Sequence, residues 1–133
     1  MIRYLLDTNS FSYAVRKAYT HFNRRFESIR MDEMGISVIT EAELRFGLAR
    51  RPDAHALAHS VNSLLNRITI RPWTSEAAKL YAGIRAELER KGQRMDDMDV
   101  MIAAHALADD TTLVTNDAAF QRISHLKTED WTA

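Results

Sequence analysis

The chain has 133 residues, of which 46% are hydrophobic and 27% charged, a composition typical of one globular domain with a real core. It contains no cysteine, which excludes disulfides and thiolate zinc sites, and its zero net charge argues against indiscriminate coating of nucleic acid. The N-terminal run from Met1 to Asp7 reaches a charge too early for a signal peptide, and no apolar run is long enough to span a bilayer. We therefore expect a cytoplasmic protein without membrane contact, with residues 1–133 forming one domain.

The predicted elements alternate between short apolar strands and amphipathic helices. In chain order they are a strand at 2–6, a helix opened by the cap cluster at 7–10, a helix at 18–29, a strand at 35–39, a helix capped by Thr40, a helix at 54–65, a strand at 68–70, helices at 74–90 and 96–108, a strand at 112–115 and a last short strand at 126–127. Such alternation predicts an α/β fold with a mostly parallel sheet covered on both faces.

Two acids follow predicted strands and two lie near the starts of predicted helices. Asp7 follows the first strand and Asp117 follows the strand at 112–115. Functional groups of open α/β sheets gather at such carboxyl ends. Glu43 lies one turn before Gly47, which leaves space beside it, and Asp99 shares its helix face with apolar residues, so its carboxylate is expected to point inward.

Each acid alone also has a structural explanation. Asp7 and Asp117 could be helix caps, Glu43 could complete a capping box with Thr40, and Asp99 could favour the helix dipole. Four carboxylates that converge on one cleft, however, repel each other by several kcal/mol per close pair at an effective dielectric constant of about 20. A cation would neutralise them, and all-oxygen ligands suit Mg²⁺ or Mn²⁺, which activate water for attack on a phosphate.

Four short motifs follow one another in the order of a known family. They are Leu5-Leu6-Asp7-Thr8-Asn9, Glu43-Leu44-x-x-Gly47, Asp99-x-x-Ile102-Ala103-Ala104-His105-Ala106 and Thr115-Asn116-Asp117-x-x-Phe120, and the chain closes with Glu129-Asp130-Trp131. Together they resemble the PIN domain, and in particular the VapC toxins of bacterial toxin–antitoxin pairs. The resemblance covers essentially the whole chain.

This resemblance implies a three-layer α/β/α PIN-like fold and an endoribonuclease that depends on Mg²⁺ or Mn²⁺. It implies a cognate antitoxin encoded alongside as partner and RNA as substrate, often a structured RNA such as tRNA, and a homodimer is a further expectation because dimers are common among relatives. The acidic tetrad matches Asp7, Glu43, Asp99 and Asp117. Asp7 and Asp99 are then the expected direct metal ligands, with Glu43 and Asp117 as further or water-mediated ligands.

The same resemblance suggests which neighbours orient the metal ligands. These candidates are Thr8, Asn9, Thr115 and Asn116. The run Met95-Asp96-Asp97-Met98-Asp99 offers three acids where the family motif has one. We choose Asp99 because Ile102-Ala103-Ala104 follows it at the expected spacing. Asp96 lies about one helical turn away and could assist, whereas Asp97 is expected to face solvent.

The charges are distributed unevenly along the chain. Residues 1–51 hold nine lysines and arginines against six acids, and the remainder holds nine against twelve. The first part is therefore a candidate phosphate-facing side, although any one of its cations could simply lie on a solvated helix face. The candidates are Arg16, Lys17, Arg24, Arg25, Arg45, Arg50 and Arg51.

Several other features admit simpler interpretations. His55 and His59 stand one turn apart, as in zinc sites, but no third ligand accompanies them. His105 follows two alanines in an apolar helix and is expected to be a hydrogen-bonded core histidine. Met95, Met98 and Met101 are read as packing residues, with a partner groove as the lesser alternative. Apolar faces around Phe11, Tyr13, Phe46 and Leu48 could receive an antitoxin segment, or these residues could all be core.

Three alternatives to a nuclease have weaker support in the sequence. A phosphatase with Asp7 as nucleophile would want a second Asp two residues on, where this chain has Asn9. A phospho-accepting receiver domain would need an acceptor Asp after a central strand and a lysine after a late strand, and neither is evident. A non-catalytic domain on a decayed nuclease fold is the third alternative, but all four acids are intact.

Overall fold

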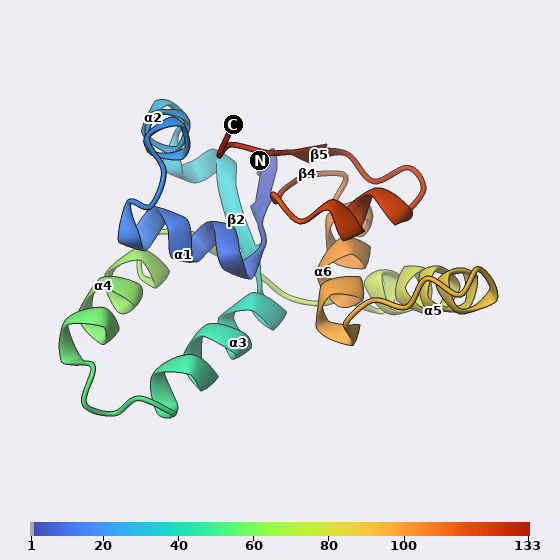
Figure 1. Cartoon of the computed structure of the whole chain (residues 1–133), viewed down its shortest axis with the longest axis horizontal. Coiled ribbons are helices and arrows are strands. Elements are labelled where there is room, and N and C mark those ends of the chain that lie inside the picture. The colour runs from blue at the N-terminus through green and yellow to red at the C-terminus, as the bar shows by residue number, and fades with distance from the viewer. Residues whose placement is uncertain (1) are drawn as a thin grey trace.

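Five short strands form one wholly parallel sheet at the centre of the molecule, seen in the computed structural model of the chain (Figure 1). The structure describes residues 2–133, so Met1, the first residue of the expected domain, lies outside the described residues. The strand order is β3-β2-β1-β4-β5. The strands are β1 (Tyr4–Leu6), β2 (Met34–Ser37), β3 (Thr69–Arg71), β4 (Thr112–Val114) and β5 (Thr128–Glu129).

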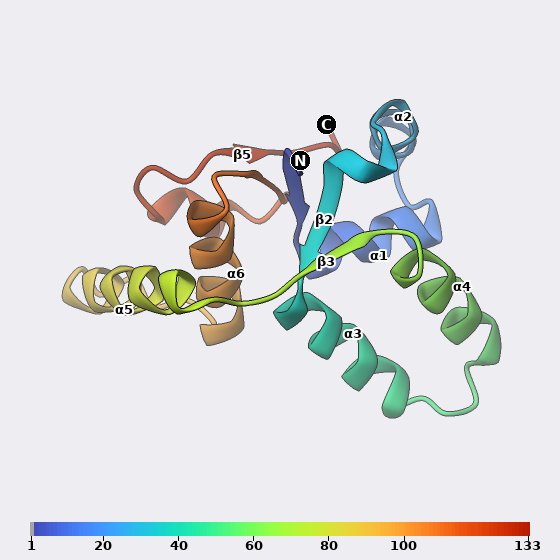
Figure 2. The same ribbon diagram turned by 180° about the vertical axis from the view of Figure 1, so that it is seen from behind.

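Helices cover both faces of this sheet, so the predicted three-layer α/β/α arrangement is confirmed (Figure 2). One face carries α1 (Thr8–Arg16), α2 (Thr20–Ser28), α3 (Val38–Ala49) and α4 (His55–Leu65), and the other carries α5 (Ser75–Arg90) and α6 (Asp97–Ala108). Two 3₁₀ turns complete the chain, η1 (Met31–Glu33) and η2 (Ala118–Arg122). Within residues 2–133, none of the helices is long and apolar enough to cross a membrane.

The sheet is buried on both sides because successive side chains of each strand enter different cores. Tyr4 and Leu6 of β1 pack into the core under α1 to α4, whereas Leu5 packs under α6. In β4, Val114 packs into the core under α1 to α4, and Leu113 packs under α6. This division explains why β1 is a continuous apolar run in the sequence, without polar alternation.

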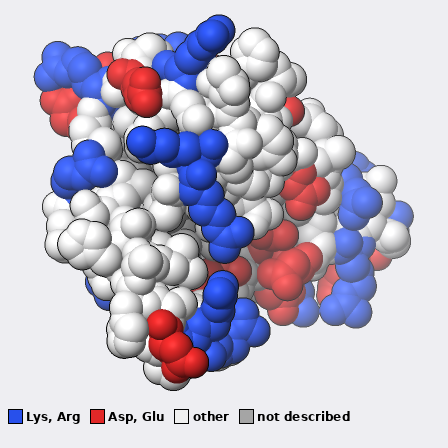
Figure 3. Space-filling view, turned by 60° about the vertical axis from the view of Figure 1, so that its left-hand side comes forward, with Lys and Arg blue, Asp and Glu red and all other residues white. Residues whose placement is uncertain are grey.

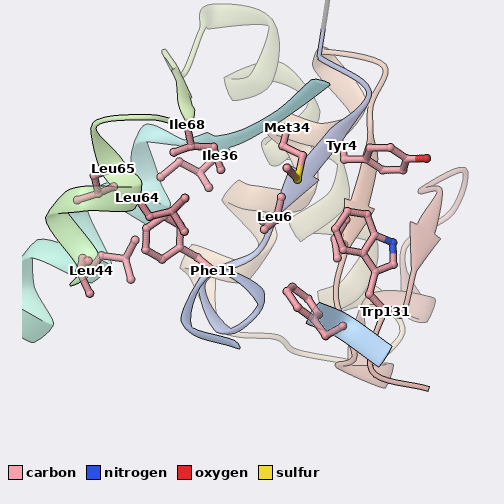
Figure 4. Close-up of a cluster of buried hydrophobic side chains, with 13 residues drawn as sticks. Tyr4, Leu6, Phe11, Met34, Ile36, Leu44, Leu64, Leu65, Ile68 and Trp131 are labelled. Atoms are coloured by element: carbon pink, nitrogen blue, oxygen red, sulfur yellow. The ribbon is translucent and has the colours of Figure 1, made fainter. Parts of the chain in front are cut away.

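The larger core fills the space between the sheet and the first four helices (Figure 4). Phe11 of α1 lies at its centre and is completely buried. Trp131, from the last residues of the chain, closes the core by packing edge-on against Tyr4, with 5.3 Å between the ring centroids. Its indole nitrogen donates a hydrogen bond of 2.9 Å to Glu129 Oε1. The C-terminal segment therefore seals the first core.

The predicted element boundaries were right to within a few residues, with one error that affects the site. Thr40 was expected to cap a helix and Glu43 to complete its capping box, but α3 begins at Val38 and its N-cap is Ser37. The Ser37 hydroxyl accepts the hydrogen bond from the Ile39 N–H at 3.1 Å, so Thr40 lies inside the helix and is buried. The capping-box interpretation of Glu43 was therefore wrong, and its carboxylate is free for another contact.

The last strand was also misplaced. It was expected at 126–127, whereas β5 spans Thr128–Glu129. Leu126 packs against the second core instead of pairing in the sheet, so an apolar residue next to a strand was mistaken for the strand itself. Both 3₁₀ turns were missed, because such short turns leave no periodic signal in the sequence.

Gly35 allows the strands to approach closely at the middle of β2. A Cβ atom at this position would lie 2.6 Å from Ile2 Cδ1 and 3.0 Å from the carbonyl oxygen of Thr69 in β3. A larger residue would therefore push β2 away from its neighbours. Gly92, which follows α5, adopts a φ of +64°, the left-handed conformation that suits a residue after a helix end.

His105 is a buried core histidine that connects α6 to the sheet, as the sequence predicted. Its Nδ1 lies 2.7 Å from the Ser37 Oγ, and both side chains are almost completely buried. Its Nε2 lies 3.3 Å from Asp109 Oδ2 but without hydrogen-bond geometry, and Arg71 donates to that same oxygen at 3.0 Å. Burial lowers the pKa of His105, so the ring is neutral at pH 7.

Removal of the Ser37 hydroxyl is expected to destabilise the fold. Ser37→Ala deletes the cap of α3 and leaves His105 Nδ1 buried without a partner, and together these losses should lower the free energy of unfolding by about 2–4 kcal/mol. Urea denaturation measures the change. The control is Ser75→Ala, an exposed serine at the start of α5 whose loss should cost less than about 0.5 kcal/mol. Equal unfolding midpoints for the two variants would contradict this role of Ser37.

Candidate active site

The sheet changes its direction of winding between β1 and β4. From β1 the chain passes to β2 and β3 on one side, and it later returns to place β4 and β5 on the other side. Two neighbouring loops therefore leave the carboxyl ends of β1 and β4 in opposite directions, the arrangement at which open α/β sheets bind ligands in a crevice. Asp7 directly follows β1, and Asp117 lies three residues beyond β4. The fold thus brings these two acids to one edge of the sheet.

Asp7 is the most buried of the four predicted acids, at 5% exposure. Its backbone N–H donates to the Val114 carbonyl at 3.1 Å, which ties it to β4, and its Oδ1 accepts a hydrogen bond from the Ser10 N–H at 2.8 Å. Burial raises the pKa of the Asp7 carboxyl, and hydrogen bonds from Thr115 and Ser10 oppose that rise. Asp7 is therefore both the N-cap of α1 and a desolvated charge in the crevice.

Glu43 reaches the same region from α3. Freed from capping, its Oε1 accepts a 2.7 Å hydrogen bond from the hydroxyl of Thr8, the residue after Asp7. Thr8 therefore holds Glu43 in place, a contact that the orienting role proposed for Thr8 requires. A Cβ atom at Gly47 would meet nothing within 4 Å, so the space predicted beside Glu43 is present.

The pKa of Asp99, which lies in the first turn of α6, is affected by all the other predicted acids. Its pKa rises from the ordinary 3.8 to about 6, first through burial, then through the negative charges of Asp96, Glu43, Asp117 and Asp7 in that order. The carboxyl is half-buried and points into the crevice side of α6, as its apolar neighbours predicted. Glu43, Asp117 and Asp7 are therefore near enough to Asp99 for their charges to raise the pKa of its carboxyl.

The two acids that precede Asp99 differ in their surroundings. Asp96 is the N-cap of α6, its Oδ1 accepts from the Met98 N–H at 2.9 Å, and its charge acts strongly on Asp99. Asp97 is exposed and faces Arg85, with 3.4 Å between Oδ1 and Nη1. Asp97 therefore points away from the site, as expected, and Asp96 borders it.

Asp117 is the most accessible acid of the tetrad. It caps η2, with its Oδ1 accepting from the Ala119 N–H at 2.9 Å. Its own N–H donates to the Thr115 hydroxyl at 3.1 Å, and Thr115 also hydrogen-bonds Asp7. Thr115 thus connects the two acids that flank the crevice.

The two predicted asparagines do not contact the acids directly. Asn116 Oδ1 accepts a 3.3 Å hydrogen bond from the Tyr13 hydroxyl. Asn9 is exposed, and within residues 2–133 none of its side-chain atoms hydrogen-bonds an acid. The sequence predicts Ser10 only as part of a turn and cap cluster. In the structure its hydroxyl also donates a hydrogen bond to the Val114 carbonyl at 2.9 Å, a contact that the sequence did not reveal. Ser10 thereby joins α1 to β4 beneath Asp7.

The donor set fits a hard divalent cation. The predicted acids and their neighbours offer carboxylate and hydroxyl oxygens, and burial and neighbouring negative charges raise the pKa of Asp99. In the part of the chain that the structure describes, no three His, Asp or Glu side chains are close enough to grip one ion together. Mg²⁺ accepts such an open arrangement, because it commonly takes one or two carboxylates and keeps several waters.

The surface around the site carries both signs of charge. Figure 3 shows acidic side chains gathered near the middle of one face, with basic side chains on either side of them. A pocket of about 210 Å³ adjoins Thr8 and Glu43, and Arg16, Arg50 and Arg51 also line it. Of the four apolar residues considered for partner binding, Phe11 belongs to the core, Tyr13 and Leu48 are partly buried, and Phe46 is 62% exposed.

Comparison with known proteins gives consistent matches over the whole length. The PIN domain pattern matches residues 4–126. Ribonuclease VapC2 of Rickettsia felis is 33% identical over 96% of this chain and 97% of its own. The tRNA(fMet)-specific endonuclease VapC of Salmonella typhimurium is 33% identical over 98% and 99%. The crystal structure of DNA-bound VapBC from Salmonella typhimurium superposes with a TM-score of 0.90 at 32% identity, covering 98% of this chain and 99% of that one.

Removal of one charge from the acidic cluster is expected to stabilise the metal-free protein. Because the folded-state pKa of Asp99 lies above its ordinary value, folded protein binds that proton more tightly than unfolded protein does. Stability in EDTA should therefore fall as pH rises from about 4 through about 6 and then level off. At pH 7.5, Asp99→Asn should raise the free energy of unfolding by about 1–2 kcal/mol, after allowance for solvent screening of a half-exposed group, and flatten this pH dependence.

Asp97→Asn is the matched control for that measurement. Both aspartates lie in the first turn of α6, so both substitutions remove the same favourable interaction with the helix dipole. Asp97 is exposed and should follow wild type within about 0.5 kcal/mol in urea denaturation. A stabilised Asp97→Asn beside an unchanged Asp99→Asn would show that the motif had been assigned to the wrong aspartate.

Proposed function

This chain belongs to the PIN-domain family, and we propose that Asp7, Glu43, Asp99 and Asp117 are the catalytic acids of a metal-dependent endoribonuclease. The observation that carries the proposal is the pKa of Asp99, raised to about 6 in part by the charges of the other three acids. Like charges are kept together at such cost chiefly where a site needs them. Residues 1–133 would form one nuclease domain, since a single sheet carries both cores.

Mg²⁺ or Mn²⁺ is the cation that these acids would hold. Asp7 and Asp99 are proposed as direct ligands, and Glu43 and Asp117 as further ligands or ligands through water. When bound, the cation lowers the pKa of a coordinated water and neutralises charge on the phosphate under attack.

The side chains of the protein prepare this site before substrate arrives. The Ser10 N–H and the Thr115 hydroxyl hold the Asp7 carboxylate in one orientation, and Thr8 does the same for Glu43. Their hydrogen bonds favour the charged forms, which can bind a cation, over the protonated forms, which cannot. Burial of Asp7 strengthens its electrostatic attraction to the ion. Asp96 adds negative charge beside Asp99, which favours cation binding without a direct contact.

The reaction is endonucleolytic cleavage of RNA, and the chain acts as the toxin of a toxin–antitoxin pair. Both roles follow from the ribonucleases and the VapBC complexes that match it along their whole length at 32–33% identity. The relative from Salmonella typhimurium is a tRNA(fMet)-specific endonuclease, and a transfer RNA is accordingly our proposed substrate. An RNA substrate implies action in the cytoplasm, which agrees with the lack of cysteine. A homodimer stays a prediction.

The residues present give less support to the alternative functions. An aspartate phosphatase would use Asp7 as a nucleophile and an acid two residues later, but that residue is the exposed Asn9. A binding domain on a decayed nuclease fold would have no reason to retain four acids whose mutual repulsion raises the pKa of Asp99.

Cleavage is expected to need both divalent metal and Asp7. Purified protein should cut single-stranded RNA with Mg²⁺ or Mn²⁺ and stop with EDTA, and Asp7→Asn should lower the rate at least about a hundredfold because it removes a charge that holds the cation. Denaturing gels of end-labelled RNA measure the rate, and a DNA oligonucleotide of the same sequence should be cut more slowly. Asp97→Asn is the control and should cut like wild type. Full activity of Asp7→Asn would refute the site assignment.

Expression of the chain alone should arrest growth. The toxin role predicts that an antitoxin encoded next to it relieves the arrest and that the two proteins co-purify. Asp7→Asn separates the two effects: it should abolish growth arrest but still bind the antitoxin. Colony counts and co-purification are the measurements. Normal growth on expression of wild-type chain, with cleavage intact in the purified protein, would count against the toxin role alone.

A further inference from the structure

The pocket beside Glu43 lies between α1, α3 and α4, next to the acidic cluster but distinct from it. Its volume is about 210 Å³, and Thr8 and Glu43 form the end that joins the active site. Three arginines, Arg16, Arg50 and Arg51, also line it, although they come from the ends of two different helices. The pocket is therefore negative at the catalytic end and positive beyond it.

These arginines have no carboxylate partners. Within residues 2–133, no acid lies within ion-pair distance of Arg16, Arg50 or Arg51. Arg45, on the same helix as Glu43, is instead paired with Glu41 at 2.8 Å. Arg25, another cation of the basic first segment, is paired with Glu129 at 3.4 Å. The tertiary structure thus leaves three unpaired cations of that segment beside the site.

Helix ends alone do not account for this arrangement. Arg16 ends α1 and Arg50 follows α3, positions where a cation interacts favourably with the helix dipole. The dipole favours one cation at each helix end. It does not explain why Arg16, Arg50 and Arg51 all line one pocket that also contains a catalytic acid. Three positive charges close together repel each other, so their convergence suggests an anionic ligand.

An exposed aromatic ring stands next to these cations. Phe46 is 62% exposed, and the Arg50 guanidinium lies over its ring, 4.8 Å from the centroid. Phe46 lies three residues after Glu43, and Arg50 lies four residues further, so the three follow one side of α3 over about 10 Å. Aromatic rings beside arginines are the usual platforms on which unpaired bases stack.

A second hollow continues beyond the arginines. It measures about 390 Å³, lies over the loop between α3 and α4, and shares Arg50 and Arg51 with the first pocket. The two hollows thus form a path that starts at Glu43, passes the unpaired cations and leaves over Pro52.

We infer that this path binds the RNA strand next to the scissile phosphate: Arg16, Arg50 and Arg51 contact its phosphates, and Phe46 stacks on one of its bases. The inference rests on the proposed function, because it needs RNA at the acidic cluster. The acids hold metal at one phosphate, and the arginines compensate for the repulsion that the same acids exert on the neighbouring ones. Phe46 adds a contact that only an unpaired nucleotide can make, which favours a single-stranded loop as target.

The test measures RNA binding separately from cleavage. A fluorescently labelled single-stranded RNA twelve nucleotides long is titrated with protein in EDTA at several salt concentrations, and anisotropy gives the affinity. Arg16→Gln, Arg50→Gln and Arg51→Gln should each weaken binding about three- to tenfold and lower the slope of log affinity against log salt by about 0.7. Phe46→Leu should weaken binding about tenfold and leave that slope unchanged.

Arg45→Gln is the matched control, since it removes one positive charge from the same helix but from a residue already paired with Glu41. Its RNA affinity should stay within twofold of wild type, and melting curves confirm that every variant folds. Equal affinities of Arg45→Gln and Arg50→Gln would overturn the inference. So would variants that bind RNA normally but fail to capture the antitoxin, because the surface would then serve the protein partner.

Gels of wild-type protein with Mg²⁺ report cleavage independently. RNA that is bound through these residues but never cut would contradict the proposed function and leave the binding path intact. Cleavage and RNA affinity that are both unchanged in all four variants would contradict the binding path and leave the proposed function intact.

Discussion

Negative charge near the carboxyl edge of the sheet, where Glu43, Asp117 and Asp7 act on Asp99, is the main electrostatic constraint on this fold. Burial first, and then repulsion from the neighbouring negative charges, raises the pKa of Asp99. The fold holds the acids there through rigid elements: Asp7 sits at the end of a fully buried strand and is tied to β4 through its own backbone and through Ser10. A parallel sheet that reverses its winding beside β1 supplies the geometry.

The hydrogen bonds around the acids show how the unfavourable charge is tolerated. Asp7 and Asp117 cap α1 and η2, so each carboxylate accepts a backbone N–H while it remains directed at the site. The helix-cap explanation of both residues is therefore correct, and capping leaves their carboxylates available for the proposed catalytic role. Glu43 is held by Thr8. Burial and four neighbouring charges raise the pKa of Asp99, as expected for an acid in the proposed cation site.

Positive charge, carried by arginines, lies close to the acids. RNA is a polyanion, so a site that grips one phosphate through a cation still repels the adjacent phosphates. Unpaired arginines at the ends of α1 and α3 lie where they can offset that repulsion, whereas cations elsewhere in the basic first segment, such as Arg25 and Arg45, are paired with acids. Net charge is zero, so attraction for nucleic acid depends on this local separation of charge.

The sequence by itself determined the order and type of the elements and the α/β class, and it singled out four candidate acids, because strand–helix alternation and the Asp positions after strands are local patterns. The tertiary structure decided what those residues touch. The cap of α3 is Ser37 and not Thr40, and Ser37 also contacts His105, sixty-eight positions away. Glu43 is free to contact Thr8, and Arg16, Arg50 and Arg51 meet at one pocket beside the site. Such contacts join residues far apart in the chain or depend on which face a helix presents, and no local pattern carries that information.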